Sequence, residues 1–176
     1  MSIVINEQCH AMTGRRWAKE PRRCKHTTNR GIFCWQHLKQ KEGFRIKKST
    51  IPNAGLGLFT TKPIKNNVNV TEYSGDHVVS RDPNYGGPYV LETKKYHYID
   101  ASKTNEKGLG RWINHQPLRK SNTKFVINRG KAYMKSTKPI AKDKELFVPY
   151  GAQYFRYFPL KKVRKAPRKS ALSRLR

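Results

Sequence analysis

The sequence predicts a mainly β fold of short sheets, with a small cysteine- and histidine-containing module before it and a basic tail after it. Three observations favour this class. Between about Phe44 and Phe158 the apolar residues form short runs bounded by glycine, proline and asparagine. No stretch of 12 residues repeats its apolar positions with the helical period. All three cysteines lie within residues 1–38.

The β region divides into short strands that follow one another along the chain. Strands are expected at Val68–Thr71, Tyr96–Ile99, Lys124–Ile127, Ala132–Met134 and Leu146–Val148. The third and fourth of these flank Asn128-Arg129-Gly130-Lys131, whose composition is typical of a hairpin turn.

One tetrapeptide occurs twice. Thr61-Lys62-Pro63-Ile64 recurs as Thr137-Lys138-Pro139-Ile140, each time after an apolar segment and before a polar turn. Proline ends strand pairing and presets the turn backbone. The repeat indicates one strand–turn–strand unit used twice, with chance as the alternative.

Composition limits the compartment and the class of partner. Lysine and arginine number 38 against 11 acids, and the resulting net charge of +27 attracts polyanions, so nucleic acid or chromatin is the expected neighbour. No apolar run reaches the roughly 20 residues needed to cross a bilayer, and the first residues lack a secretory signal, so no membrane contact is expected. An odd number of cysteines argues against a disulfide framework. We expect the nucleus, that of a host cell if the chain is virus-encoded, or otherwise the cytoplasm. The sequence predicts no oligomeric state.

The N-terminal module contains a potential metal site. Cys9, Cys24, Cys34 and His37 supply three thiolates and one imidazole, a complete tetrahedral set for structural zinc. His10 and His26 are possible substitute ligands, and free buried cysteines are the alternative interpretation. The module either binds nucleic acid or acts as a docking brace for the next domain. The expected division is a zinc-binding module at 1–38, a linker at 39–43, the main domain at 44–158 and a basic disordered tail at 159–176.

Three separated segments carry the strongest functional signal. They are Gly55-Leu56-Gly57-Leu58-Phe59, Arg111-Trp112-Ile113-Asn114-His115 and Glu145-Leu146-Phe147-Val148-Pro149-Tyr150-Gly151. Their order and spacing resemble the SET domain of protein-lysine methyltransferases, and the resemblance covers about residues 44–158. It implies the β-clip SET fold, in which the second and third segments meet in a knot-like, threaded arrangement. Such threading is rare among proteins.

The resemblance also implies a cofactor, S-adenosylmethionine, and the residues that hold it. The loop Ala54-Gly55-Leu56-Gly57 holds the methionine part and the ribose, because glycine permits close approach of the backbone. Asn114 is implied at the methionyl end and His115 at the adenine.

The same resemblance implies the residues that handle the lysine. Tyr150 and Tyr73 are the expected catalytic residues, Tyr150 beside the methyl group and Tyr73 in the wall of the lysine channel, where it orients the amine. Phe125 falls where the family places an aromatic that limits methylation state, and its missing hydroxyl predicts di- or trimethylation. The alternative is that these aromatics pack in a sheet core. Asp100 and Glu145 are expected as structural hydrogen-bond partners rather than acid–base catalysts.

The sequence departs from the family in two places. Gln116-Pro117 replaces the usual Ser-Cys, and Asn122 supplies the expected asparagine after a longer loop. The cysteine-rich cluster that often follows the domain is absent from the sequence. In its place Tyr154, Phe155, Tyr157 and Phe158 are expected to close the lysine channel and to stack on adenine.

The expected function is methylation of a protein lysine, in a histone tail, with S-adenosylmethionine as the methyl donor. Eight of the 11 acids lie between Glu72 and Glu145, so a basic peptide suits this region while the basic ends contact nucleosomal DNA or other nucleic acid. Residues 165–171 resemble a core-histone tail, which suggests Lys169 as an automethylation site or pseudosubstrate, with a solvated tail as the alternative. The rival functions are an inactive SET-like protein that binds chromatin or nucleic acid, and a methyltransferase of a non-histone basic protein.

Overall fold

The computed structural model describes residues 2–13 and 22–158. The basic tail, with Lys169, lies outside the described residues. Among the helices in these two ranges, none has the length and apolar character to span a membrane.

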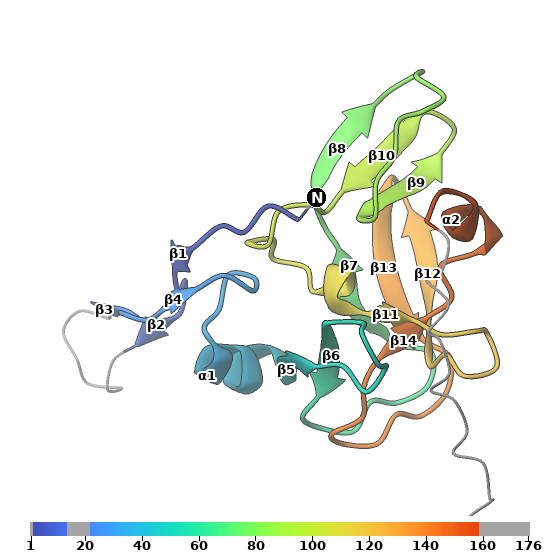
Figure 1. Ribbon diagram of the computed structural model, residues 1–176. Helices are drawn as coiled ribbons and strands as arrows, with labels where there is room; N and C mark the ends of the chain where they lie inside the picture. The colour runs from blue at the N-terminus through green and yellow to red at the C-terminus, as the bar shows by residue number, and fades with distance from the viewer. Residues whose placement is uncertain (1, 14–21, 159–176) are drawn as a thin grey trace, which may run out of the picture.

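Figure 1 shows the N-terminal module as a separate lobe beside a larger β region. Two antiparallel strand pairs build the module: β1 (Glu7–Gln8) with β4 (Thr27–Thr28), and β2 (Met12–Thr13) with β3 (Arg22–Arg23). One helical turn, α1 (Trp35–His37), continues into the π-helical η1 (Leu38–Glu42). The buried centre of the module consists of Cys9, Ala11, Cys24 and Cys34.

The segment 39–43, expected as a polar linker, is helical up to its last residue. Gly43 ends η1 with a left-handed φ of 74° and donates its N–H to Leu38 O. Glycine adopts this conformation without a steric penalty. The two lobes are therefore joined by a capped helical turn that leads directly into the first strand of the β region.

The β region consists of small sheets, which confirms the mainly β class. β5 (Phe44–Lys48) pairs with β6 (Leu56–Thr60). One three-stranded sheet has the order β12 (Thr123–Asn128), β13 (Lys131–Ser136), β7 (Asn69–Tyr73). A second has the order β8 (Asp76–Val79), β10 (His97–Asp100), β9 (Val90–Lys94). The remaining elements are η2 (Gly110–Trp112), the parallel pair β11 (Asn114–His115) and β14 (Phe147–Val148), and α2 (Ala152–Tyr157).

The predicted hairpin between β12 and β13 is confirmed. Asn128 pairs with Lys131, and Arg129 and Gly130 have φ values of 47° and 79°. Two consecutive positive φ values define the type I′ turn, whose twist matches that of the paired strands.

The two copies of Thr-Lys-Pro-Ile pair with each other. Ile64 and Ile140 form an isolated antiparallel bridge in which each N–H donates to the other carbonyl at 2.9 Å. The proline before each isoleucine has no N–H to extend the ladder, so the pairing stays short. The two copies therefore meet at equivalent positions in the fold.

The C-terminal strand β14 runs between two segments that one loop connects. On one side it pairs in parallel with β11. On the other, Asn122 N–H donates to Phe147 O (3.1 Å) and Phe147 N–H donates to Asn122 Oδ1 (2.8 Å). Since residues 116–121 join these two neighbours, β14 passes beneath their loop. This is the threaded arrangement that the resemblance implies, and Asn122 is the residue that secures it.

The N-terminal segment docks on the β region at a second point. Ile3 N–H donates to Ser102 O (2.8 Å), and Thr104 N–H donates to Ile3 O (3.0 Å). The guanidinium of Arg111, only 6% exposed, donates to Ser2 Oγ (2.8 Å) and to Ser102 O (3.1 Å). The chain before the first cysteine is thus tied to residues next to the second motif.

Candidate active site and metal centre

The glycine loop precedes β6 and is closed by its own backbone. Ser49 N–H donates to Gly55 O (2.9 Å), and Ala54 N–H donates to Ile51 O (3.2 Å). Gly55 has a φ of 73°, and a Cβ placed on it would meet no atom within 4 Å. This loop therefore presents an open face at Gly55, where a ligand can approach the backbone.

Gly57 is a glycine for a different reason. A Cβ placed on it would lie 2.1 Å from Glu145 Oε1 and 3.1 Å from Asn114 Nδ2. Side chains from the second and third motifs fill the space that a larger residue would need. The three motifs converge at this point.

Glu145 is buried, and its carboxylate collects four hydrogen bonds. Oε1 accepts from Ser49 Oγ (2.7 Å) and Asn114 Nδ2 (3.2 Å), and Oε2 accepts from Thr50 N–H (2.7 Å) and Thr50 Oγ1 (2.6 Å). These bonds hold the base of the glycine loop to β11. The structural role expected for Glu145 is confirmed.

Asn114 and His115 occupy β11, beside the threaded strand. Asn114 Nδ2 also donates to Leu56 O (2.9 Å), while Asn114 Oδ1 accepts from no group in the described part of the chain. An unused acceptor therefore lies next to the glycine loop. His115 Nδ1 accepts from Tyr150 N–H (3.1 Å), and burial lowers the pKa of His115 from 6.5, which keeps the ring neutral at pH 7.

Tyr150 connects the cofactor segments to a cluster of aromatic rings. Its hydroxyl donates to Ile113 O (2.9 Å), and its ring lies 5.4 Å from that of His115 and 4.6 Å from that of Tyr154, between centroids. Burial raises the pKa of Tyr150 well above 10, so the side chain is a neutral phenol at physiological pH.

Tyr73 and Phe125 extend this cluster across a sheet. Their rings meet edge-on with centroids 5.8 Å apart, and the Tyr73 hydroxyl donates to Tyr89 O (2.9 Å). They come from β7 and β12, which β13 separates, and the residue paired with Tyr73 on β13 is the buried Ala132. Its small side chain leaves the two rings room to meet. Burial, with Tyr150 as the next contributor, raises the pKa of Tyr73.

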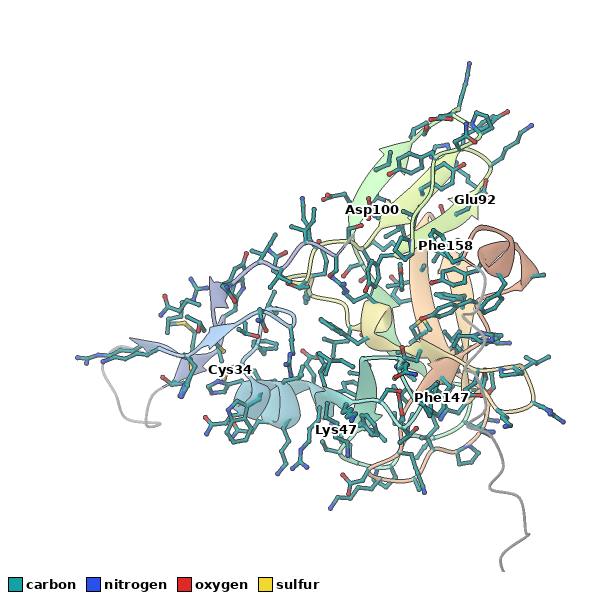
Figure 2. All side chains as sticks on the ribbon, in the orientation of Figure 1. Cys34, Lys47, Glu92, Asp100, Phe147 and Phe158 are labelled. Atoms are coloured by element: carbon teal, nitrogen blue, oxygen red, sulfur yellow. The ribbon has the colours of Figure 1, made fainter. Side chains whose placement is uncertain are left out.

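The helix α2 and the residue that follows it add three rings to the cluster. Tyr154 lies 5.2 Å from both Phe155 and Phe158, and Phe155 lies 4.6 Å from His115, between centroids. Phe158 is labelled beside α2 in Figure 2. The side chain of Tyr157 lies outside the described residues. The aromatic cluster is defined as Tyr73, Phe125, Tyr150, Tyr154, Phe155 and Phe158, and the rings of Tyr150 and Phe155 connect it to His115 on β11.

Comparison with known families identifies this arrangement. The family model of the SET domain matches residues 55–151. The chain belongs to the SET domain family. It is similar to the histone-lysine N-methyltransferase set-17 of Caenorhabditis elegans, with 30% identity over 115 residues. The match covers 63% of this chain and 42% of that protein, so the chain spans less than half the length of the curated relative that it matches.

The SET domain match contains the expected residues of the three motifs together with Tyr73 and Phe125. Ala54 immediately precedes the match, and the four aromatic residues between 154 and 158 follow it. The structure brings Leu56, Gly57 and Asn114 into direct contact, and it joins His115 to Tyr150. Ala54 contributes only a backbone bond within its own loop. The binding and catalytic roles of these residues remain predictions.

The cysteine and histidine group lies outside the matched SET domain. The ligand atoms of Cys9, Cys24, Cys34 and His37 all lie within 4.8 Å of one another, and the three cysteines are buried. Cys34 is labelled in Figure 2, in the N-terminal lobe. Tetrahedral zinc, with bonds of about 2.3 Å to sulfur, separates its ligand atoms by roughly 4 Å, so the group fits this ion.

The two alternative histidines are placed differently. His26 Nδ1 lies 3.4 Å from Cys24 Sγ, at the margin of the group, whereas His10 Nε2 lies 3.4 Å from Glu7 Oε2. His37 Nδ1 lies 3.2 Å from Cys34 Sγ and 3.5 Å from Cys9 Sγ, which favours His37 as the fourth ligand.

Sequence reasoning missed three groups that support the SET domain site. Ser49 and Thr50 precede the glycine loop, and their hydroxyls donate to Glu145. The two adjacent polar residues were the only sign in the sequence that could have indicated this role. Tyr89 contributes a backbone carbonyl, which no side-chain motif reveals. Arg111 belongs to the second motif, and its guanidinium lies 4.3 Å from the Tyr89 ring and 4.7 Å from the Trp112 ring.

Proposed function

We propose that this SET domain chain is a protein-lysine N-methyltransferase that uses S-adenosylmethionine. The observation that carries the proposal is the convergence of the three motifs at Gly57, with the aromatic cluster beside them. The similarity to a protein named as a histone-lysine methyltransferase supports it.

The residues present suit this cofactor. The open face at Gly55 admits a ligand to the backbone, and the free Asn114 Oδ1 is an acceptor for the ammonium of a methionyl group. His115, whose ring contacts Phe155, would lie toward the adenine. When bound, S-adenosylmethionine supplies an electrophilic methyl carbon on a sulfonium ion.

The aromatic cluster prepares the lysine. A free lysine amine has a pKa near 10.4 and is mostly charged at neutral pH, whereas methyl transfer requires the neutral amine as nucleophile. Apolar rings remove water from the ammonium and lower its pKa. Tyr73 and Tyr150 stay protonated because burial raises their pKa values, so they orient the amine through hydroxyl oxygens and do not act as bases. The amine proton is therefore lost to solvent before the transfer.

A basic peptide, such as a histone tail, is the proposed substrate. Asp76 follows Tyr73 by three residues, and it pairs with Asp100 across the β8–β10 pair. Asp76 also contributes, after burial, to the raised pKa of Glu106. Lys103 Nζ already lies 2.8 Å from Asp76 Oδ2, so this region attracts cationic groups, as it would those of a basic peptide. The surplus of basic residues elsewhere suits nucleosomal DNA, and the nucleus is the proposed location.

Methyl transfer from radiolabelled S-adenosylmethionine to core histones tests the proposal, with Tyr150→Phe as the matched variant. We expect a loss of rate on the order of 10²-fold in the variant, with cofactor affinity within a few-fold of wild type, because only the alignment of the transfer is removed. If the protein binds the cofactor and methylates another basic protein but not histones, the substrate is a non-histone protein. Binding of DNA without cofactor binding would instead identify an inactive chromatin-binding protein.

A further inference from the structure

Glu145 is the one buried carboxylate that the proposed chemistry does not use, among the described residues. It is 4% exposed, and each of its oxygens meets a group that can only donate. These obligate donors are Thr50 N–H on Oε2 and Asn114 Nδ2 on Oε1. The carboxylate therefore acts purely as an acceptor, and its position is fixed from both sides.

The inner surroundings of Asn114 determine which way its amide faces. Its Nδ2 lies 2.9 Å from Leu56 O and 3.2 Å from Glu145 Oε1, and both neighbours are acceptors. A reversed amide would place Asn114 Oδ1 against two other oxygens, which is unfavourable. The amide nitrogen therefore faces Leu56 O and Glu145 Oε1, and Oδ1 faces away from both.

We propose that Glu145 is a positioning residue that sets the polarity of Asn114 and thereby makes the pocket specific for a ligand with an ammonium group. This inference rests on the proposed function, since it concerns the methionyl end of the cofactor. The other hydrogen bonds of the carboxylate, from Ser49 and Thr50, support it, because they hold Glu145 Oε1 within reach of Asn114 Nδ2.

Glu145→Gln tests the positioning role with little change of shape. Thr50 N–H requires an oxygen on its side, so the new amide NH₂ takes the place of Oε1, where it faces Asn114 Nδ2. Two donors then oppose each other, and Asn114 either turns or withdraws. In both cases the pocket loses its acceptor for the ammonium.

The probes are S-adenosylhomocysteine, which carries the ammonium, and 5′-methylthioadenosine, which has the same nucleoside and sulfur but no amino-acid end. Calorimetry on the full chain should show that Glu145→Gln binds S-adenosylhomocysteine about 10- to 100-fold more weakly, the loss expected for a hydrogen bond to a charged group. Affinity for 5′-methylthioadenosine should change less than about threefold. Thr50→Val is the control: it removes the hydroxyl donor to Oε2 but keeps the Thr50 N–H and Asn114 contacts, so it should lower the unfolding temperature and leave the affinity ratio of the two ligands unchanged.

Equal weakening of both ligands in Glu145→Gln overturns the positioning role and leaves a structural one. If that variant does not fold, Glu145→Asp keeps the charge and withdraws the carboxylate by one methylene. It should also lower the affinity for S-adenosylhomocysteine relative to 5′-methylthioadenosine. A wild-type ratio of the two affinities overturns the inference. Wild-type protein that binds neither ligand overturns the proposed function itself, so the two failures are distinguishable.

Discussion

Tyr73 and Tyr150 donate their hydroxyl hydrogens to backbone carbonyls, of Tyr89 and Ile113 respectively. Each oxygen keeps its lone pairs for a substrate amine, while burial holds the pKa of both phenols above 10. Both side chains thus stay neutral over the whole pH range in which a lysine amine loses its proton, as the proposed role of acceptor requires.

The pH dependence of the rate follows from these directions. Raising the pH from about 7 to about 10 should increase kcat/KM steadily, because the neutral fraction of the substrate lysine rises and neither tyrosine ionises in that range. Initial rates on a single-lysine peptide, with circular dichroism to verify folding, measure this. A fall in rate near pH 10 that disappears in Tyr73→Phe would contradict it.

Phe125 offers a separate test at the same scale. Its ring contacts Tyr73 but carries no hydroxyl that could retain a water beside the amine, so a methylated amine has space. We expect wild type to yield di- or trimethyllysine and Phe125→Tyr to shift the product toward monomethyllysine. Mass spectrometry of a peptide at complete turnover gives the distribution, and identical distributions for both proteins would refute the assignment.

At the scale of elements, the glycine loop depends on two residues with different constraints. Gly55 needs its positive φ, whereas Gly57 needs the absence of a side chain because Glu145 occupies that space. Glu145 cannot yield easily, since four hydrogen bonds hold it.

Substitution of Gly57 by alanine should therefore lower the free energy of unfolding by about 1–3 kcal/mol, the usual cost of overpacking. Gly86→Ala is the matched control, because a Cβ at Gly86 meets no atom within 4 Å; its effect should stay within about 0.5 kcal/mol. Urea denaturation of both variants makes the comparison. Equal stabilities would mean that Glu145 moves aside.

The sequence predicts the elements with local signals and misses those without them. The hairpin at 128–131 was predictable because its turn residues specify the φ values, and the repeated Thr-Lys-Pro-Ile was predictable as a strand end. α2 and η2 were missed because segments of six and three residues are too short to show helical periodicity. β8 was missed because its pairing with β10 is decided by residues far along the chain.

The same distinction holds for the candidate site. Gly55, Asn114 and Tyr150 are recognisable as side-chain motifs, so the sequence indicated them. Ser49 and Thr50 act through Glu145, which is about a hundred positions away, and Tyr89 acts through its backbone. Contacts of that kind become visible only when the chain has folded.

At the scale of the whole molecule, the N-terminal lobe is held to the β region at several points. Besides η1 with its Gly43 cap and the segment around Ile3, the module itself contributes Gly31 N–H, which donates to Thr104 O, and Glu7, which accepts from Asn105 Nδ2. This multiple attachment favours the docking brace among the two roles considered for the module.

Loss of the metal should therefore affect the β region as well as the module. We expect about one zinc per chain, absent from His37→Ala but retained in His10→Ala, because only His37 lies among the three sulfurs. Chelation should lower the unfolding temperature and increase hydrogen exchange at residues 102–104. Metal analysis and exchange mass spectrometry measure both effects. Wild-type protein that is as stable after removal of zinc as before it would refute the site.

The passage of β14 beneath the loop at 116–121 also bears on how the protein is made. During translation every other described strand leaves the ribosome before β14. Glu145 and Tyr150 flank β14 in the sequence, so the site is incomplete until this strand has been made. A nascent chain consequently lacks the complete site that we propose for the methyl donor. If the loop forms first, we expect the insertion of β14 beneath it to be the slowest step of folding.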